Sequence, residues 1–233
     1  MSEQSPGLLQ WLTAIGTVAI AFFAAFQHHI LSWLNTPKLN VKTGNEPPFI
    51  RQLIFINENK RTTSSGYAVR LYFRNITPWY KKKTRAEDVE VFIKSISRKT
   101  GQGFQVLQDF EPRNVLWSHL HLEPSSASCF TDISPKMERY ALIGRMVYPG
   151  YTEEFFGYKR NENASLKIDV YPPRNTNDHI LWPGTYRLEC LIGAENVKAF
   201  IKTFEIHISG QWSDDPEKMI GEHISIQEVE NGR

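Results

Sequence analysis

The chain has 233 residues, of which 41% are hydrophobic and 22% are charged, and its 27 basic residues nearly balance its 25 acidic ones. This length suits one domain with an appendage, or at most two small domains, and is ample for a hydrophobic core. Two cysteines exclude a disulfide-rich scaffold and a cysteine-rich zinc module. An aromatic content of 12% excludes a wholly disordered chain.

An uncharged segment near the N-terminus predicts a transmembrane helix within residues 1–36. No Asp, Glu, Lys or Arg occurs from Gln4 to Pro37, and Leu8 to Phe26 reads LLQWLTAIGTVAIAFFAAF. At about 1.5 Å per residue, this run is roughly 28 Å long as a helix, close to the thickness of the hydrocarbon core of a bilayer. Trp11 and Trp33 are spaced to contact the two membrane interfaces.

A cleaved signal peptide is the alternative interpretation of this segment. A signal peptide needs a basic stretch before the apolar run and a small-x-small cleavage site after it. The chain begins MSEQSPG, without a basic residue, and its small-x-small sequence at Ala19–Ala21 lies in the middle of the run. We therefore expect an uncleaved anchor.

The charges that flank the helix predict its orientation. No Lys or Arg precedes the helix, whereas Lys38, Lys42 and Arg51 follow it. Because basic flanks stay inside, we expect a single-pass protein of the inner (plasma) membrane, with a short N-terminus outside and the C-terminal domain in the cytoplasm. Cys129 and Cys190 would be reduced thiols there.

Small residues recur on one face of the predicted helix, at Thr13, Thr17, Ala21 and Ala25. Stripes of this kind allow two helices to approach closely. One interpretation is a helix–helix contact between copies of the chain, which would make it a homo-oligomer. The other is that small residues are common in any membrane helix.

The remainder of the chain predicts a β-domain. Pro37 ends the helix, because the residue before a proline avoids the helical region, and a linker spans 37–48. Residues 49–209 alternate apolar and polar side chains, as in EDVEVFIKSIS, with the clearest strands within 66–75, 87–97, 165–172, 184–193 and 199–209. Weaker strands are expected at Gln52–Asn57, Phe104–Phe110 and Ser126–Ile133. Without βαβ units, an antiparallel β-sandwich is expected.

Two segments interrupt this pattern. Residues 134–160 are expected to be an insertion, with a short helix in MERYALIGRM followed by a loop. Residues 210–233 are expected to be a solvated, acidic C-terminal tail that is partly ordered. A one-turn helix is expected there, with Asp214 or Asp215 as its cap and Pro216 at its first position.

The segment LWPGTYRLECLIGAEN, Leu181 to Asn196, resembles the penultimate strand of immunoglobulin-like sandwiches, in which a tyrosine enters beside a Pro-Gly turn. The following AFIKTFEIHISGQW resembles their last strand. Tyr186 precedes Cys190 by four residues, whereas the true signature has a spacing of two. The whole plan resembles bacterial single-pass membrane proteins of unknown function with a cytoplasmic immunoglobulin-like sandwich. This resemblance implies an architecture and no activity.

A metal site is one hypothesis for His119, His121 and Glu123. Alternate residues of a strand face the same side, so three ligands can converge. The alternative is that Trp117, Leu120 and Leu122 form an apolar face and the histidines are the solvated face.

A basic loop is the other candidate site: Trp79, Tyr80, Lys81, Lys82, Lys83 and Arg85. Two aromatic residues followed by basic ones suit contact with an anionic membrane surface. A single basic loop is thin support for nucleic-acid binding. The plain alternative is a solvated loop whose charges are offset by Glu87 and Asp88.

No P-loop, dinucleotide fingerprint or Gly-x-Ser-x-Gly motif occurs, so no cofactor and no catalytic residue is predicted. The expected function is a membrane-anchored, non-catalytic binding module with the lipid bilayer and a protein as partners. A metal-dependent enzyme on the sandwich and a structural subunit of a membrane-tethered oligomer are the alternatives.

Overall fold

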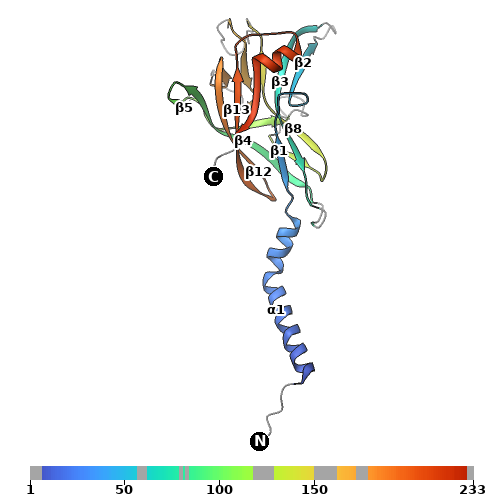
Figure 1. The fold of residues 1–233 in the computed structure, drawn as a ribbon. Helices are drawn as coiled ribbons and strands as arrows, with labels where there is room; N and C mark the ends of the chain where they lie inside the picture. Colours follow the sequence, from blue (N-terminus) through green and yellow to red (C-terminus); the bar gives the residue numbers. More distant parts are fainter. Residues whose placement is uncertain are drawn as a thin grey trace.

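The computed structural model consists of one long helix followed by a β-domain (Figure 1). The structure describes residues 7–56, 62–78, 81, 84–117, 129–149, 162–171 and 178–229. Helix α1, Leu8–Asn35, projects from one end of the β-domain. The fold is therefore mainly β with an N-terminal apolar helix, as the sequence predicts.

Fourteen strands form the β-domain within the described residues. They are β1 (Leu39–Lys42), β2 (Ile50–Ile56), β3 (Thr62–Asn75), β4 (Ala86–Thr100), β5 (Gly103–Val106), β6 (Arg113–Trp117), β7 (Thr131–Ile133), β8 (Glu138–Val147), β9 (Ser165–Ile168), β10 (Val170–Tyr171), β11 (Ile180–Leu181), β12 (Gly184–Ala194), β13 (Val197–Ile208) and β14 (Ile224–Val229).

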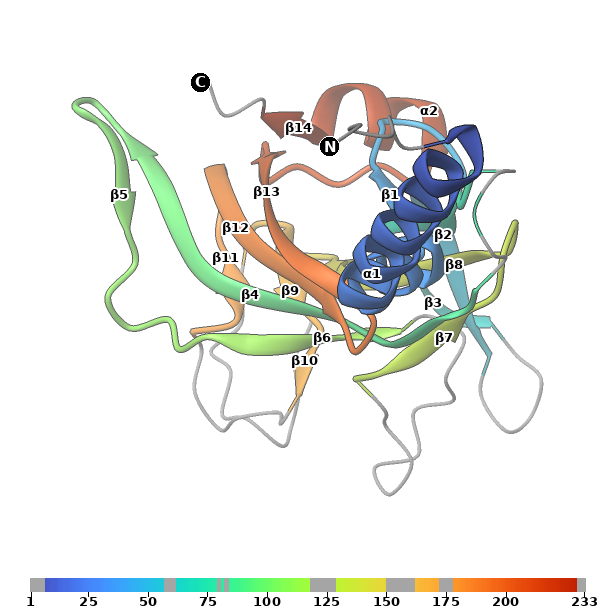
Figure 2. The same cartoon turned by 90° about the horizontal axis from the view of Figure 1, so that it is seen from below.

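All described strand pairs are antiparallel, and the strands join into one sheet in the order β1-β3-β8-β6-β4-β12-β13-β14. Strand β6 joins the part of the sheet that contains β3 and β8 to the part that contains β4 and β12. Its residues Arg113 and Asn114 pair with β4, whereas Leu116 and Trp117 pair with β8. Figure 2 shows the strands curving around the middle of the domain. The sheet is thus barrel-like, and an immunoglobulin-like sandwich is not confirmed.

The period-two segments supply the core between the curved layers. Val89, Val91 and Ile93 of β4 are completely buried, and Leu188 and Cys190 of β12 lie in the same core. A tight hairpin follows β4, with Thr100 paired to Gly103 of β5. Alternation therefore identified these strands because each has one buried and one solvated face.

Two expectations for the segments around these strands are wrong. Leu39–Lys42 lies within the predicted linker but forms β1, which pairs with β3 and buries Leu39 and Val41. The expected helix in MERYALIGRM is strand β8, which pairs with β3 over most of its length. Ala141 to Gly144 are all buried, so the middle of β8 lacks the alternation that marks a strand with one wet face.

The predicted acidic tail also belongs to the fold. Asp215 caps the short helix α2, Pro216–Lys218, by accepting from the Glu217 amide at 3.0 Å, as expected. One π-helical turn, η2 (Met219–His223), and β14 then follow, and β14 pairs with β13. Met219, Ile220, Ile224 and Ile226 are buried. A solvated tail is therefore wrong for residues 210–229.

The C-terminal segment lies beside the start of the β-domain (Figure 2). The Ile226 amide donates to Asn45 Oδ1 at 2.6 Å, and the Tyr67 hydroxyl donates to the Ser213 carbonyl at 3.1 Å. Tyr67 also packs edge-on against Trp212, with 5.4 Å between ring centroids. These contacts join the last strand of the sheet to the segment around β1–β3.

Candidate membrane-proximal interface

Helix α1 exposes its apolar side chains instead of packing them against the β-domain. The window Leu9–Gln27 has a mean hydropathy of 1.8 and none of it is buried. Leu9 and Ile20 are 80% and 72% exposed. The Thr13 and Thr17 hydroxyls donate to the carbonyls one turn earlier, at 2.8 and 2.9 Å, so their polarity is satisfied within the helix. By length and composition this helix can cross a membrane.

An aromatic stripe follows the second half of α1, and the sequence reasoning missed it. Phe22, Phe26, His29 and Trp33 line one groove on the helix surface. The centroids of the Phe22 and Phe26 rings lie 4.5 Å apart. Their spacing of four, three and four residues is the signal that identifies one helix face.

The helix enters the β-domain through a joint of three residues, Thr36 to Lys38. The Lys38 carbonyl accepts from the Ile76 amide at 2.8 Å, and the Lys38 amide donates to the Thr77 hydroxyl at 3.4 Å. Lys81 Nζ lies 4.6 Å from the centroid of the Trp33 ring, a cation–π contact. The end of α1 is therefore fixed against the loop between β3 and β4.

Asn75 organises that loop from inside the protein. Its side chain is 1% exposed. Nδ2 donates to the carbonyls of Thr84 and Ile133 at 2.9 and 3.0 Å, and Oδ1 accepts from the amide and hydroxyl of Thr77 at 3.2 and 2.5 Å. One buried amide thus holds the beginning and end of the β3–β4 loop together and links them to β7.

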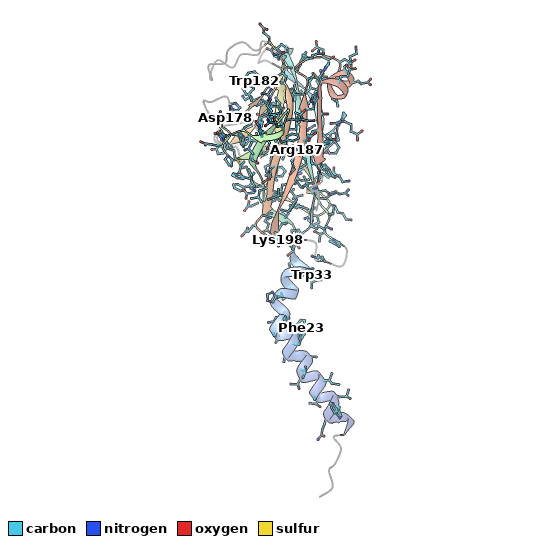
Figure 3. All side chains as sticks on the ribbon, turned by 60° about the vertical axis from the view of Figure 1, so that its left-hand side comes forward. Phe23, Trp33, Asp178, Trp182, Arg187 and Lys198 are labelled. Carbon is cyan, nitrogen blue, oxygen red and sulfur yellow. The ribbon has the colours of Figure 1, made fainter. Side chains whose placement is uncertain are left out.

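A second turn lies at the same end of the domain. In the β12–β13 hairpin, Asn196 Nδ2 donates to the Arg85 carbonyl at 2.8 Å and Asn196 Oδ1 accepts from the Glu87 amide at 3.2 Å. Figure 3 shows Lys198 of this hairpin at the end of the β-domain that α1 enters. The turn between β7 and β8 is bonded to the end of β3, because the Lys136 amide donates to the Asn75 carbonyl at 3.0 Å.

Each of these segments carries a basic residue: Lys38, Lys81, Arg85, Lys136 and Lys198. Acidic residues nearby are Glu87, Asp88, Asp132 and Glu195. Arg85 and Asp132 form an exposed ion pair at 3.2 Å, which contributes little to stability. The lysines are accordingly the side chains best suited to meet anionic headgroups.

The structure brings together only part of the predicted membrane-contact set. Trp11 and Trp33 are 60% and 54% exposed near the two ends of α1, and Lys81 and Arg85 lie at the domain end that the helix enters. Trp79, Tyr80, Lys82 and Lys83 lie outside the described residues. The proposed helix–helix residues Thr13, Thr17, Ala21 and Ala25 are all exposed on α1.

The metal hypothesis rests on a segment that the structure does not describe. His119, His121 and Glu123 lie between the described ranges that end at 117 and resume at 129. Within those described ranges, no group of three His, Cys, Asp or Glu side chains is placed to hold a metal ion.

The two cysteines are buried thiols. Cys190 is completely buried, and burial raises the pKa of its thiol to about 12. Burial also raises the pKa of Cys129, with a further contribution from Glu90. Neither thiol is activated as a nucleophile, because a raised pKa keeps it protonated.

Two largely buried ion pairs lie elsewhere in the β-domain. Arg113 and Asp178 are 5% and 7% exposed, with Nη2 and Oδ2 3.5 Å apart. Arg145 binds Asp169 through two nitrogens, at 2.6 Å for Nη2–Oδ1 and 2.9 Å for Nε–Oδ2. The Arg113 pair joins β6 to the residues before β11, and the Arg145 pair joins β8 to the residue between β9 and β10.

No protein-family model, no curated protein and no solved structure matches this chain.

Proposed function

We propose that the chain is a single-pass, membrane-anchored and non-catalytic binding module. Helix α1 spans the bilayer, and the β-domain stands at the cytoplasmic surface with its helix-bearing end toward the lipid. The rest of the domain presents its surface to a protein partner. The cytoplasmic orientation follows from Lys38, Lys42 and Arg51, which flank the helix on one side only.

One observation carries this proposal: the apolar window of α1 is 0% buried in the protein. Large side chains such as Leu9, Ile20 and Phe22 would each lose about 1.5–3 kcal/mol of favourable burial if left in water. A bilayer removes this cost over the whole window and leaves the helical backbone satisfied internally.

The joint supports a domain that stays close to the membrane. With three residues between α1 and β1, the domain has no long tether. Lys81 lies over Trp33, an aromatic residue of the kind that occupies the membrane interface. Lys38, Lys136 and Lys198 at the same end would each gain about 1 kcal/mol near an anionic leaflet.

Membrane integration can be tested by alkaline carbonate extraction of cell membranes. We expect the wild-type chain to remain in the membrane pellet. A variant with Ile15→Asp and Val18→Asp is expected to leave the pellet, because each carboxylate costs several kcal/mol inside the bilayer. The matched control, Ile15→Leu with Val18→Leu, keeps the helix apolar and is expected to stay. Release of the wild-type chain by carbonate would contradict the proposal.

A further inference from the structure

Arg70 is a buried arginine on the face of β3 that points away from the main core. Its neighbours Val69 and Leu71 are completely buried core residues, so alternation directs Arg70 to the opposite face. The side chain is nevertheless only 9% exposed. Its guanidinium carbon lies 5.1 Å from the centroid of the Tyr140 ring. Burial of a charge at this depth needs compensation from an opposite charge or from hydrogen bonds.

The hydrogen-bond donors of Arg70 are not compensated within the protein. Nε and Nη2 are both buried, and neither has a hydrogen-bond partner in the described part of the chain. These two nitrogens direct their hydrogens along the same edge of the planar guanidinium. That edge matches the two oxygens of a carboxylate or phosphate in a bidentate pair.

The same sheet contains an arginine whose equivalent edge is satisfied. Arg145 of β8 lies opposite Ala68, two residues from Arg70, and its Nε and Nη2 bind the Asp169 carboxylate. For Arg145, the protein itself provides the acidic partner of the Nε/Nη2 edge. Burial lowers the pKa of Arg70, and Arg51, a second cation that pairs with Ala68 from the neighbouring strand β2, lowers it further.

We propose that the Nε/Nη2 edge of Arg70 binds an oxyanion, the carboxylate or phosphate group of a ligand. Tyr140 supports the face of the guanidinium, and Arg51 adds a second positive charge. The edge has the geometry that Arg145 uses for Asp169, and the desolvated site strengthens each charge-assisted hydrogen bond. This site is independent of the membrane anchor, because Arg70 lies in the body of β3 and outside the joint with α1.

The test measures thermal unfolding of the full-length protein in neutral detergent by intrinsic fluorescence. In Tris chloride, we expect Arg70→Met to raise Tm by about 2–4 °C, because it removes a buried charge that the fold does not pair. At constant ionic strength, sodium phosphate or sodium acetate is expected to raise the Tm of the wild type but not that of Arg70→Met. A response to phosphate alone assigns a phosphate ligand, and a response to acetate assigns a carboxylate.

Two further variants make the result decisive. Arg145→Met is expected to lower Tm, because it leaves the buried Asp169 carboxylate unpaired. Arg70→Lys keeps the charge but loses the two-pronged edge, so its response to the anion is expected to disappear. The proposal is overturned if Arg70→Met lowers Tm as Arg145→Met does. It is also overturned if neither anion shifts the wild type, or if the Arg70 variants respond as the wild type does.

Discussion

The two ends of the chain have opposite relations between composition and burial. The N-terminal helix is strongly apolar, yet none of its window Leu9–Gln27 is buried in the protein. The C-terminal segment from Asp214 is rich in acidic residues, yet Met219, Ile224 and Ile226 are almost completely buried. The composition of a segment therefore indicates whether it lies in lipid, in water or in the protein core only when all of its residues share one environment. Burial of a mixed segment depends on which few side chains face the sheet.

If the buried residues of the C-terminal segment stabilise the fold, removal of that segment must destabilise the protein. Termination of the chain after Gly210 removes α2, η2 and β14, uncovers the core around Phe204 and Ile206, and exposes the edge of β13. We expect the truncated protein to lose its cooperative thermal transition, measured by intrinsic fluorescence in detergent. The control is truncation after Val229, which keeps every described element. A truncated chain with the wild-type Tm would show that the segment adds nothing to the fold.

The joint at the other end is expected to depend on one buried amide. Asn75→Ala removes two donors and an acceptor, and leaves the Thr84 and Ile133 carbonyls without their bonds to Nδ2. Unsatisfied buried groups cost about 1–3 kcal/mol each, so we expect a clear loss in the free energy of unfolding, measured in urea.

The control for this experiment is Gln105→Ala, since Gln105 is an exposed residue of β5. We expect that variant to change the free energy by at most about 0.5 kcal/mol. An Asn75→Ala protein as stable as the control would contradict the role of the amide.

The buried thiol of Cys190 makes the free energy of unfolding depend on pH in the alkaline range. Cys190 has a pKa of about 12 in the folded state, against an ordinary value of 9.0. Between these values the unfolded chain holds fewer protons than the folded one, so the free energy of unfolding falls as pH rises above about 9. Cys190→Val is expected to reduce this fall while leaving stability at pH 7 nearly unchanged. Identical pH profiles, measured by urea unfolding, would show that the thiol does not contribute.

The smallest expected effect concerns lysines at the membrane-proximal end. Lys81→Glu with Lys198→Glu replaces attraction to anionic headgroups by repulsion, and exposed charges of this kind change stability little. In nanodiscs, we expect phosphatidylserine to slow hydrogen exchange of Ile76–Ala86 in the wild type but not in this variant. Pure phosphatidylcholine is the reference.

A charge-matched control reverses two exposed lysines elsewhere, Lys99 on the β4–β5 hairpin and Lys218 in α2. This control is expected to retain the slowing by phosphatidylserine. Equal hydrogen exchange of the wild type in both lipids would contradict contact between the β-domain and anionic headgroups, while leaving the helix anchor unaffected.

The sequence predicts those parts of the fold in which one strand face is buried and the other is wet. Tyr186, Leu188, Cys190 and Ile192 alternate in β12 and are buried in the core. Strand β8 did not show this pattern because its middle residues, Ala141 to Gly144, are buried on both faces. Strand β1 is only four residues long and gains its stability from pairing with β3, a partner about thirty residues later in the chain.

The candidate interface was predictable as a set of residue types but not as an arrangement. The apolar helix and the lysines that follow it were visible in the sequence. The contact of Lys81 with Trp33 and the clamp formed by Asn75 depend on bonds between distant segments, for which a single sequence gives no rule. In the alternating segment 66–75, Arg70 has the position of an ordinary outward residue, and only its burial and its unpartnered nitrogens distinguish it.

We propose that α1 crosses the membrane and leaves the β-domain in the cytoplasm. Two fusions at Arg233 test it directly: a reporter that is active only in the cytoplasm and a reporter that is active only after export. We expect the first to be active and the second to be silent, because the basic residues follow the helix and none precedes it. Activity of the exported reporter alone would contradict the orientation and would place both cysteines in an oxidising compartment.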